Sequence, residues 1–175
     1  MKVEINESTL ELAQGDIVDQ ETEAIVHAAN KRLAPGGGVA GAIHRAAGPK
    51  LWEECRKLNG CETGEAKITD GYDLKTSKII HTVGPIYENS SEDAQLLKKC
   101  YLNSLKLAEK NDIDSISFPA ISTGAFGYPI EKAAEIALDT VIAFLRDGSK
   151  ISLVRFVLYN SQAFDVHQET LQELL

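Results

Sequence analysis

The sequence predicts an α/β protein, a three-layer α/β/α sandwich in which helices cover both faces of a central, mixed and mostly parallel sheet. Short apolar runs typical of strands alternate along the chain with longer runs in which apolar residues recur every three or four positions. No repeat, linker or low-complexity tract interrupts this alternation. A length of 175 residues suits one domain, so we expect a single domain over residues 1–175.

The first half of the chain is expected to contain four strands and two helices. The expected strands cover residues 9–14, 24–28, 65–69 and 78–83. Residues 39–47 are small and apolar, which indicates a buried helix. Gly48 and Pro49 follow it and permit a second helix to about Leu58.

The second half is expected to combine two further strands with three helices. Residues at helical spacing are Leu97, Cys100, Tyr101, Ser104, Leu105 and Ala108, and then Ala133, Ile136, Ala137, Val141, Phe144 and Leu145. The expected strands cover residues 115–120 and 153–159. Pro129 suits the first position of the second of these helices, and Ser161 is expected to cap a final helix that reaches Leu174.

The composition favours a cytoplasmic monomer that takes a small ligand. The formal net charge of −8 disfavours nucleic-acid binding, although backbone N–H groups can hold a phosphate locally. Neither a signal-peptide pattern nor an apolar run long enough to cross a membrane is present. The three cysteines include no CxxC pair and are expected to be free thiols, and neither a metal site nor a cofactor is indicated.

Three loops follow predicted strands directly, at residues 15–17, 30–38 and 122–128. In folds of this class, ligands bind beyond the carboxyl ends of the strands. If the strands are parallel, the three loops meet at one edge of the sheet. Their convergence predicts a binding site there.

Two of these loops have the composition of phosphate-binding turns. Residues 36–38 are three glycines before a helix, so backbone N–H groups can approach an anion and the helix adds its positive end. Residues 122–127 (STGAFG) join a strand to a helix and carry Phe126, which is expected on a sugar face or in the core. Each loop alone is compatible with an ordinary turn, and neither matches the GxGxxG or P-loop pattern.

Three single side chains at strand ends could also contact a ligand. Asp16 would accept a hydrogen bond from an adenine amino group or be a solvated cap, and Asn30 would bind sugar hydroxyls or form a turn. Tyr159 would stack on a base or pack in the core. His27, His44 and His81 lie in apolar stretches and are expected to be core residues, since no catalytic Ser–His–Asp or Cys–His order is present.

Taken in order, these segments resemble the macrodomain family, specifically its MacroD-type branch. The matching text is GDI (residues 15–17), AIVHAAN (24–30), GGGVAGAIHRAAGP (36–49), GCETGEAKIT (60–69), HTVGP (81–85) and FPAISTGAFGYP (118–129). The resemblance spans nearly the whole chain and implies a macrodomain-like fold that binds ADP-ribose.

The resemblance also implies a role for each site residue. Asp16, with the Ile17 amide beside it, would accept a hydrogen bond from adenine N6, and Tyr159 or Asn160 would border the adenine. Asn30 would bind the distal ribose and act in catalysis. The residues that would line the diphosphate and distal ribose are Gly37, Gly38, Val39, Ala40, Ser122, Thr123, Gly124, Ala125 and Phe126.

Two positions depart from the family pattern. The family strand usually reads NAAN, but this chain has His27 in place of the first asparagine, at a position expected to point away from the ligand. MacroD-type hydrolases often carry an aspartate where this chain has Ala40. A carboxylate that could orient or activate water is therefore missing.

The resemblance implies hydrolysis of mono-ADP-ribose esters on acidic protein side chains, of O-acetyl-ADP-ribose, or of both, with ADP-ribosylated proteins as partners. A carboxylate leaving group needs no general acid, and loss of a general base slows a reaction by about 10²- to 10⁴-fold without forbidding it. One alternative is a non-catalytic ADP-ribose reader, which Ala40 favours. Another is an RNA or poly-ADP-ribose module, which the net charge of −8 disfavours.

Overall fold

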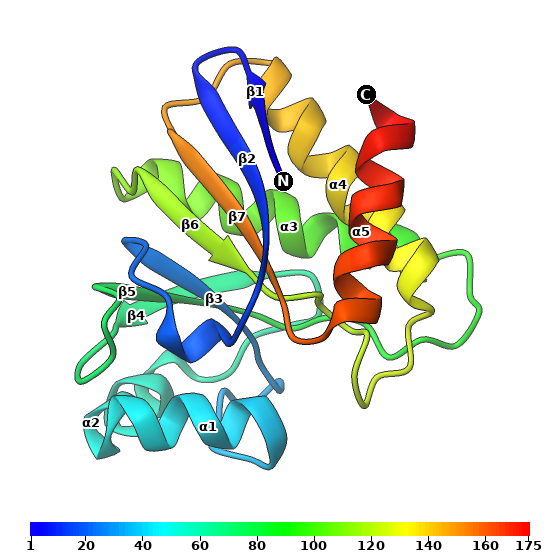
Figure 1. Ribbon diagram of the computed structural model, residues 1–175. Helices are drawn as coiled ribbons and strands as arrows, with labels where there is room; N and C mark the ends of the chain where they lie inside the picture. Colours follow the sequence, from blue (N-terminus) through cyan, green and yellow to red (C-terminus); the bar gives the residue numbers. More distant parts are fainter.

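The protein, described over residues 1–175 by a computed structural model, has a seven-stranded sheet in the order β1-β2-β7-β6-β3-β5-β4 (Figure 1). The strands are β1 (Lys2–Ile5), β2 (Ser8–Gln14), β3 (Ala24–Ala28), β4 (Ala66–Asp70), β5 (Lys78–Thr82), β6 (Ser115–Phe118) and β7 (Leu153–Leu158). The five inner strands run parallel, and β1 and β4 pair antiparallel at the two edges. The mixed, mostly parallel sheet expected from the sequence is confirmed.

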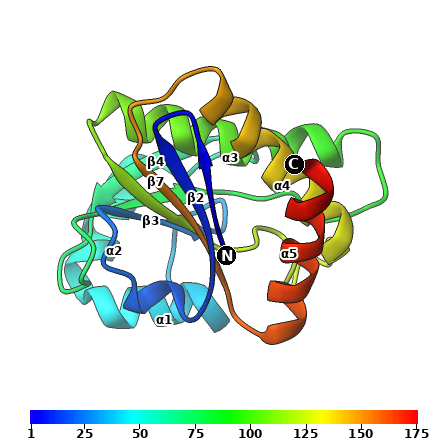
Figure 2. The same ribbon diagram turned by 45° about the horizontal axis from the view of Figure 1, so that its top comes forward.

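Helices cover both faces of this sheet. They are α1 (Gly38–Ala47), α2 (Pro49–Cys55), α3 (Asp93–Lys110), α4 (Ile130–Arg146) and α5 (Ser161–Leu174), with short 3-10 helices η1 (Ile17–Asp19) and η2 (Arg56–Leu58). Figures 1 and 2 show α1 and α2 over one face and the other three over the opposite face. The two faces bury separate apolar clusters of 13 and 28 residues, which confirms the three-layer sandwich. None of the helices is both long and apolar enough to cross a bilayer.

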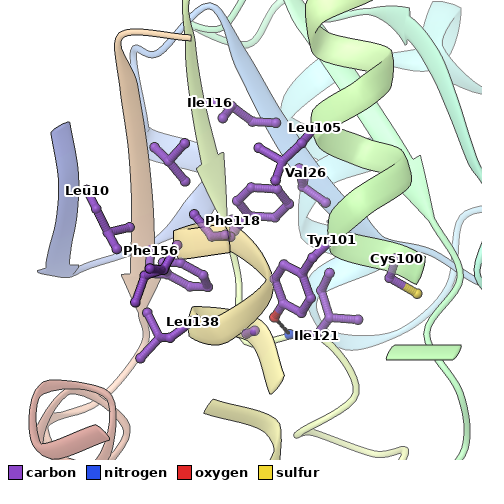
Figure 3. Packing of buried hydrophobic residues seen from close by; sticks show 14 of the residues in the cluster. Leu10, Val26, Cys100, Tyr101, Leu105, Ile116, Phe118, Ile121, Leu138 and Phe156 are labelled. Atoms are coloured by element: carbon purple, nitrogen blue, oxygen red, sulfur yellow. Dashed lines mark hydrogen bonds between the residues drawn. The ribbon is translucent and has the colours of Figure 1, made fainter. Parts of the chain in front are cut away.

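The larger cluster fixes the chain where it leaves β6. Figure 3 shows Tyr101 of α3 packed beside Phe118 of β6, with ring centroids 5.1 Å apart. The Tyr101 hydroxyl donates to the carbonyl of Pro119 (3.2 Å) and accepts from the N–H of Ile121 (3.1 Å). This buried tyrosine therefore anchors the segment that leads directly into the loop at residues 122–128.

The structure differs from the sequence-based expectation by one additional strand and by the N-cap residues of two helices. The edge strand at residues 2–5 was not expected, because four residues are too few to show a clear alternation. Pro129 occupies the N-cap of α4 rather than its first turn. Asn160, not Ser161, caps α5, since its side-chain oxygen accepts from the N–H of Ala163 at 2.8 Å.

Three histidines cluster between α1 and the sheet. His27 of β3 and His81 of β5 are register partners, and their Nδ1 atoms lie 3.1 Å apart. The Nε2 of His81 lies 2.8 Å from the Thr69 hydroxyl, whereas the Nε2 of His27 has no partner. His44 of α1 packs against the His27 ring with centroids 5.9 Å apart. The histidines therefore lie in the core, as expected, and connect α1 to β3.

Burial keeps these rings neutral. Burial, and then the nearby His44, lowers the pKa of His27 to about 3. Burial also lowers the pKa of His81 well below its ordinary value, with a further contribution from His27 and His44. A buried cation would lose its hydration without gaining a counter-ion here, so protonation opposes folding.

All three cysteines are unpaired and buried. Burial raises the pKa of the Cys55, Cys61 and Cys100 thiols to about 11 in each case. The thiols are therefore protonated at neutral pH, which makes them poor nucleophiles.

We expect the free energy of unfolding to fall as the pH drops below about 6.5, the pKa of an unfolded histidine. Because the folded pKa values are lower, the neutral rings contribute full stability above that pH, and the contribution is lost below it. At pH 5 the loss from His27 alone is about 2 kcal/mol. Urea unfolding of the native protein and of His27→Asn at pH 7 and pH 5 measures it. An equal pH dependence in both proteins would contradict this expectation.

Candidate functional site

A cleft of about 680 Å³ opens beyond the carboxyl ends of the parallel strands. This volume lies in the range of small-molecule sites. The residues that line it are Gly15, Asp16, Ile17, Gly38, Val39, Ala42, Pro119, Ala120, Thr123, Gly124, Tyr128, Ile130, Val157, Tyr159, Asn160, Gln162 and Ala163. They come from the segments that follow β2, β6 and β7, and from the start of α1 after β3.

Eight of the residues predicted from the sequence line this cleft. They are Asp16, Ile17, Gly38, Val39, Thr123, Gly124, Tyr159 and Asn160. The predicted residues outside the lining are Asn30, Gly37, Ala40, Ser122, Ala125 and Phe126. Of these six residues, all except Asn30 lie within two sequence positions of a residue that lines the cleft.

Of the wall formed by α5 and the end of β7, only Tyr159 and Asn160 were predicted from the sequence. Val157, Gln162 and Ala163 line the cleft there, together with Pro119 from the end of β6. The one available signal was Asn160, whose spacing to Ala163 is that of a helix N-cap and its third residue. Nothing local shows that this helix start faces the glycine loops, because that depends on how β7 sits between β2 and β6.

Two groups of backbone N–H groups at the cleft make no hydrogen bond to the protein. The first belongs to residues 38–40, at the start of α1, where no side chain caps the helix. The second belongs to residues 124–126, in the loop after β6. The strands β3 and β6 that lead to them are neighbours in the sheet, so the groups lie close together. Such a pair of amide clusters can bind an anion without a cationic side chain.

The side chains that line the cleft leave anion binding to the backbone N–H groups, because none of them is cationic. Asp16 is the only lining residue that is charged at neutral pH, so no lysine or arginine is available to neutralise an anion. The Oδ1 atom of Asp16 accepts from the N–H of Val18 at 3.1 Å, and its other oxygen has no protein partner. That free oxygen is an acceptor for an N–H donor of a ligand.

The two exposed apolar side chains at the cleft lie on different elements. Val39 of α1 is 53% exposed, and Tyr159, which follows β7, is 80% exposed. Neither packs in the core, which excludes that alternative for Tyr159. An exposed aromatic ring beside a cleft can stack on a flat ligand group.

Asn30 has little hydrogen-bonding capacity left for a ligand. Its Oδ1 accepts from the N–H of Arg32 (3.1 Å) and of Ala34 (3.0 Å), and its Nδ2 donates to the carbonyl of Ala34 (2.8 Å). An amide side chain has two N–H donors, so one N–H remains. Asn30 can therefore donate to a sugar hydroxyl or a water, but its oxygen is already occupied and cannot accept the proton of an attacking water.

Ser122 shapes the second loop from inside the protein. Its backbone has a positive φ of 69°, and its buried hydroxyl has no hydrogen-bond partner. A Cβ at Gly84 would lie 2.2 Å from the Ser122 Oγ, so only glycine fits at that position. The N–H of Tyr128 donates to the Ser122 carbonyl at 2.9 Å and closes the loop.

The site contains neither a metal-binding cluster nor a nucleophile paired with a base. No group of three or more His, Cys, Asp or Glu side chains is arranged to hold a metal ion. The histidines are buried in the core and absent from the cleft lining. The cleft can thus bind and orient a polar ligand, but its own side chains offer almost no acid–base chemistry.

Comparison with known proteins identifies close relatives. The family model described as Macro domain matches residues 26–137. A Macro domain-containing protein of Methanosarcina mazei is 48% identical over 176 residues, which cover 100% of this chain and 94% of that protein. The ADP-ribose glycohydrolase MACROD2 of Homo sapiens is 47% identical over 165 residues, which cover 93% of this chain but only 39% of that longer protein.

Solved structures give the same result. The Oceanobacillus iheyensis macrodomain with ADP matches with a TM-score of 0.96 and 46% identity, over 99% of this chain and 95% of that chain. A glycine-to-valine mutant of that macrodomain with ADPR matches with a TM-score of 0.96 and 45% identity, over 99% of this chain and 97% of that chain.

We expect Asn30→Ala to lower the free energy of unfolding by about 1–2 kcal/mol, because the loop loses three local hydrogen bonds. Asn30→Asp keeps the acceptor oxygen and should lose less. Guanidinium unfolding of the three proteins measures the difference. An alanine variant as stable as the native protein would show that Asn30 does not hold this loop.

Proposed function

This chain belongs to the Macro domain family, and on that premise we propose that it binds ADP-ribose in the cleft and hydrolyses ADP-ribose esters. The substrates would be mono-ADP-ribose esters on acidic side chains of proteins, O-acetyl-ADP-ribose, or both. Relatives near 50% identity are named ADP-ribose glycohydrolases, and structural relatives contain ADP or ADPR. The partners would be ADP-ribose and ADP-ribosylated proteins.

The observation that carries the proposal is the pair of unsatisfied amide clusters in a cleft without cationic side chains. A diphosphate carries charge on several oxygens and can accept from both clusters at once. In this proposal, the diphosphate and the distal ribose contact residues 37–40 and 122–126. Phe126 borders the distal ribose, and its carbonyl accepts from the N–H of Tyr87 at 2.9 Å, which fixes the loop.

The adenine would occupy the opposite end of the cleft. Adenine N6 presents N–H donors, and the free oxygen of Asp16 is an acceptor beside the Ile17 amide. Tyr159 is exposed at this end and would cover the flat face of the base. In this arrangement, the turn at Asp16 forms the hydrogen bond to the base, and Tyr159 after β7 supplies the stacking ring.

The proposed reaction needs little acid–base help from the protein. For an ester carried on the anomeric carbon of the distal ribose, water adds to that carbon, the bond from it to the ester oxygen breaks, and the electron pair leaves with the carboxylate. A carboxylate with a pKa of about 4 leaves without protonation. The Asn30 oxygen is occupied and Ala40 has no carboxylate, so the proton of the water would pass to the substrate phosphate or to solvent.

One specific observation favours a second candidate function, a non-catalytic ADP-ribose reader. Neither Ala40 nor Asn30 offers a free acceptor for the attacking water. General-base assistance is worth about 10²- to 10⁴-fold, so its absence could reduce turnover to an insignificant rate. Binding would be the same in both functions, and turnover separates them.

We expect Gly124→Glu to abolish ADP-ribose binding. A Cβ at Gly124 meets nothing within 4 Å, so the variant should fold, but the carboxylate would enter the space of the diphosphate. Isothermal titration with ADP-ribose measures binding. Gln172→Glu adds the same charge to an exposed position near the end of α5 and should bind normally. Unchanged affinity in Gly124→Glu would place the ligand elsewhere.

We expect the native protein to release ADP-ribose from a mono-ADP-ribosylated glutamate ester faster than the uncatalysed rate. Ala40→Asp should raise that rate by about 10²-fold, because it supplies the missing carboxylate. Release is measured by chromatography under single-turnover conditions. A native rate equal to the uncatalysed rate, with intact binding, would support the reader function instead.

A further inference from the structure

A chain of three polar side chains connects the neighbouring strands β2 and β7 to Asp16. Glu11 of β2 and Arg155 of β7 are register partners, and the Arg155 Nε donates to the Glu11 Oε2 at 2.8 Å. The Nη1 of Arg155 donates to the Gln20 Oε1 at 3.1 Å. The Nε2 of Gln20 then donates to the backbone carbonyl of Asp16 at 3.0 Å. Figure 1 shows β2 and β7 side by side as they lead toward this turn.

The partners of Gln20 leave its amide only one orientation. A guanidinium group only donates, and a backbone carbonyl only accepts, so a flipped amide would break both hydrogen bonds. The side chains of Arg155 and Glu11 are 25% and 16% exposed, which limits competition from water. Gln20 therefore connects a mostly buried ion pair to the backbone of Asp16.

The turn that carries the Asp16 carboxylate is also anchored by Ile17, which is buried in the smaller apolar cluster, but few hydrogen bonds fix Asp16 itself. The N–H of Gly15 donates to the carbonyl of Leu158 at 2.9 Å, and the N–H of Asp19 donates to the Asp16 carbonyl at 3.2 Å. Asp16 itself is exposed. The Gln20 contact is thus the only side-chain hydrogen bond from outside η1 to the backbone of this residue.

We propose that Gln20 is a positioning residue for adenine selectivity, which acts by holding the Asp16 turn against the Arg155–Glu11 pair. The inference rests on the proposed binding of ADP-ribose. Adenine N6 donates to a carboxylate oxygen, whereas hypoxanthine has a carbonyl oxygen at that position and would repel it. Discrimination between the two bases therefore depends on where the Asp16 carboxylate is held, and a displaced turn lowers it.

The decisive variant is Gln20→Glu, which separates positioning from folding. The new carboxylate keeps an acceptor for Arg155 and turns that contact into an ion pair. It loses the donor to the Asp16 carbonyl and sets an oxygen against it. We therefore expect the melting temperature to stay equal or rise while adenine selectivity falls. A purely structural role would instead lower the melting temperature together with adenine selectivity.

The experiment compares the affinities of ADP-ribose and of its inosine analogue, IDP-ribose, by calorimetric titration. In Gln20→Glu, the ratio of the two affinities should fall by about 3- to 10-fold, as expected for the loss of one hydrogen bond. Gln20→Ala should lower the ratio similarly without the added charge. Gln14→Glu is the matched control, because Gln14 is exposed nearby, makes no side-chain hydrogen bond and should leave the ratio unchanged.

The outcomes distinguish this inference from the function on which it rests. A native protein that does not bind ADP-ribose would overturn the proposed function and the inference with it. Native binding with an unchanged ratio in both Gln20 variants would overturn the inference alone. The same holds if ADP-ribose and IDP-ribose weaken by equal factors, since that would reflect a general loss of the site.

Discussion

The backbone N–H groups of residues 38–40 and 124–126, which no protein group satisfies, are the constraint on which the rest of the site depends. Unpaired donors are unfavourable unless water or a ligand satisfies them, so the loops must be held open by other contacts. The parallel pairing of β3 and β6 brings the two loops together, and Tyr101 anchors the second of them from the core. An acidic protein can thereby offer a diphosphate site in which every donor is neutral.

The proposed ribose-binding residues also offer few free polar atoms. Asn30 uses both acceptor positions and one donor to hold its own loop, and Ala40 contributes no polar atom. The fold can therefore position a substrate, but the substrate must supply most of the reactivity. An ester of ADP-ribose meets that requirement because its carboxylate leaves without a proton. The end of the cleft proposed for the adenine differs, since Gln20 connects Asp16 to the ion pair between β2 and β7.

Much of the fold could be predicted from the sequence because its signals are local. The stripes of α3 and α4 recur at helical spacing, and all the residues expected on the α3 stripe are buried. The five inner strands and β4 were predicted from short apolar runs or, for β2, from alternation of apolar and polar residues. The loops at residues 15–17, 36–38 and 122–127 were identifiable from glycines at strand ends. The edge strand β1 and the N-cap residue of α5 were not predicted correctly. A short edge strand and the choice between adjacent cap residues leave only weak local signals in the sequence.

The sequence by itself determined the alternation of strands and helices and the resemblance to a family, because both depend only on the order and spacing of residues. Tertiary structure alone decided which polar atoms remain free. Hydrogen bonds within the loop occupy the Asn30 oxygen, and Arg155 reaches Gln20 only because β7 pairs with β2, more than a hundred residues earlier in the chain. Each donor or acceptor can be used by any group that folding brings beside it. Which of them stay free for a ligand therefore cannot be deduced from the order of residue types in the sequence.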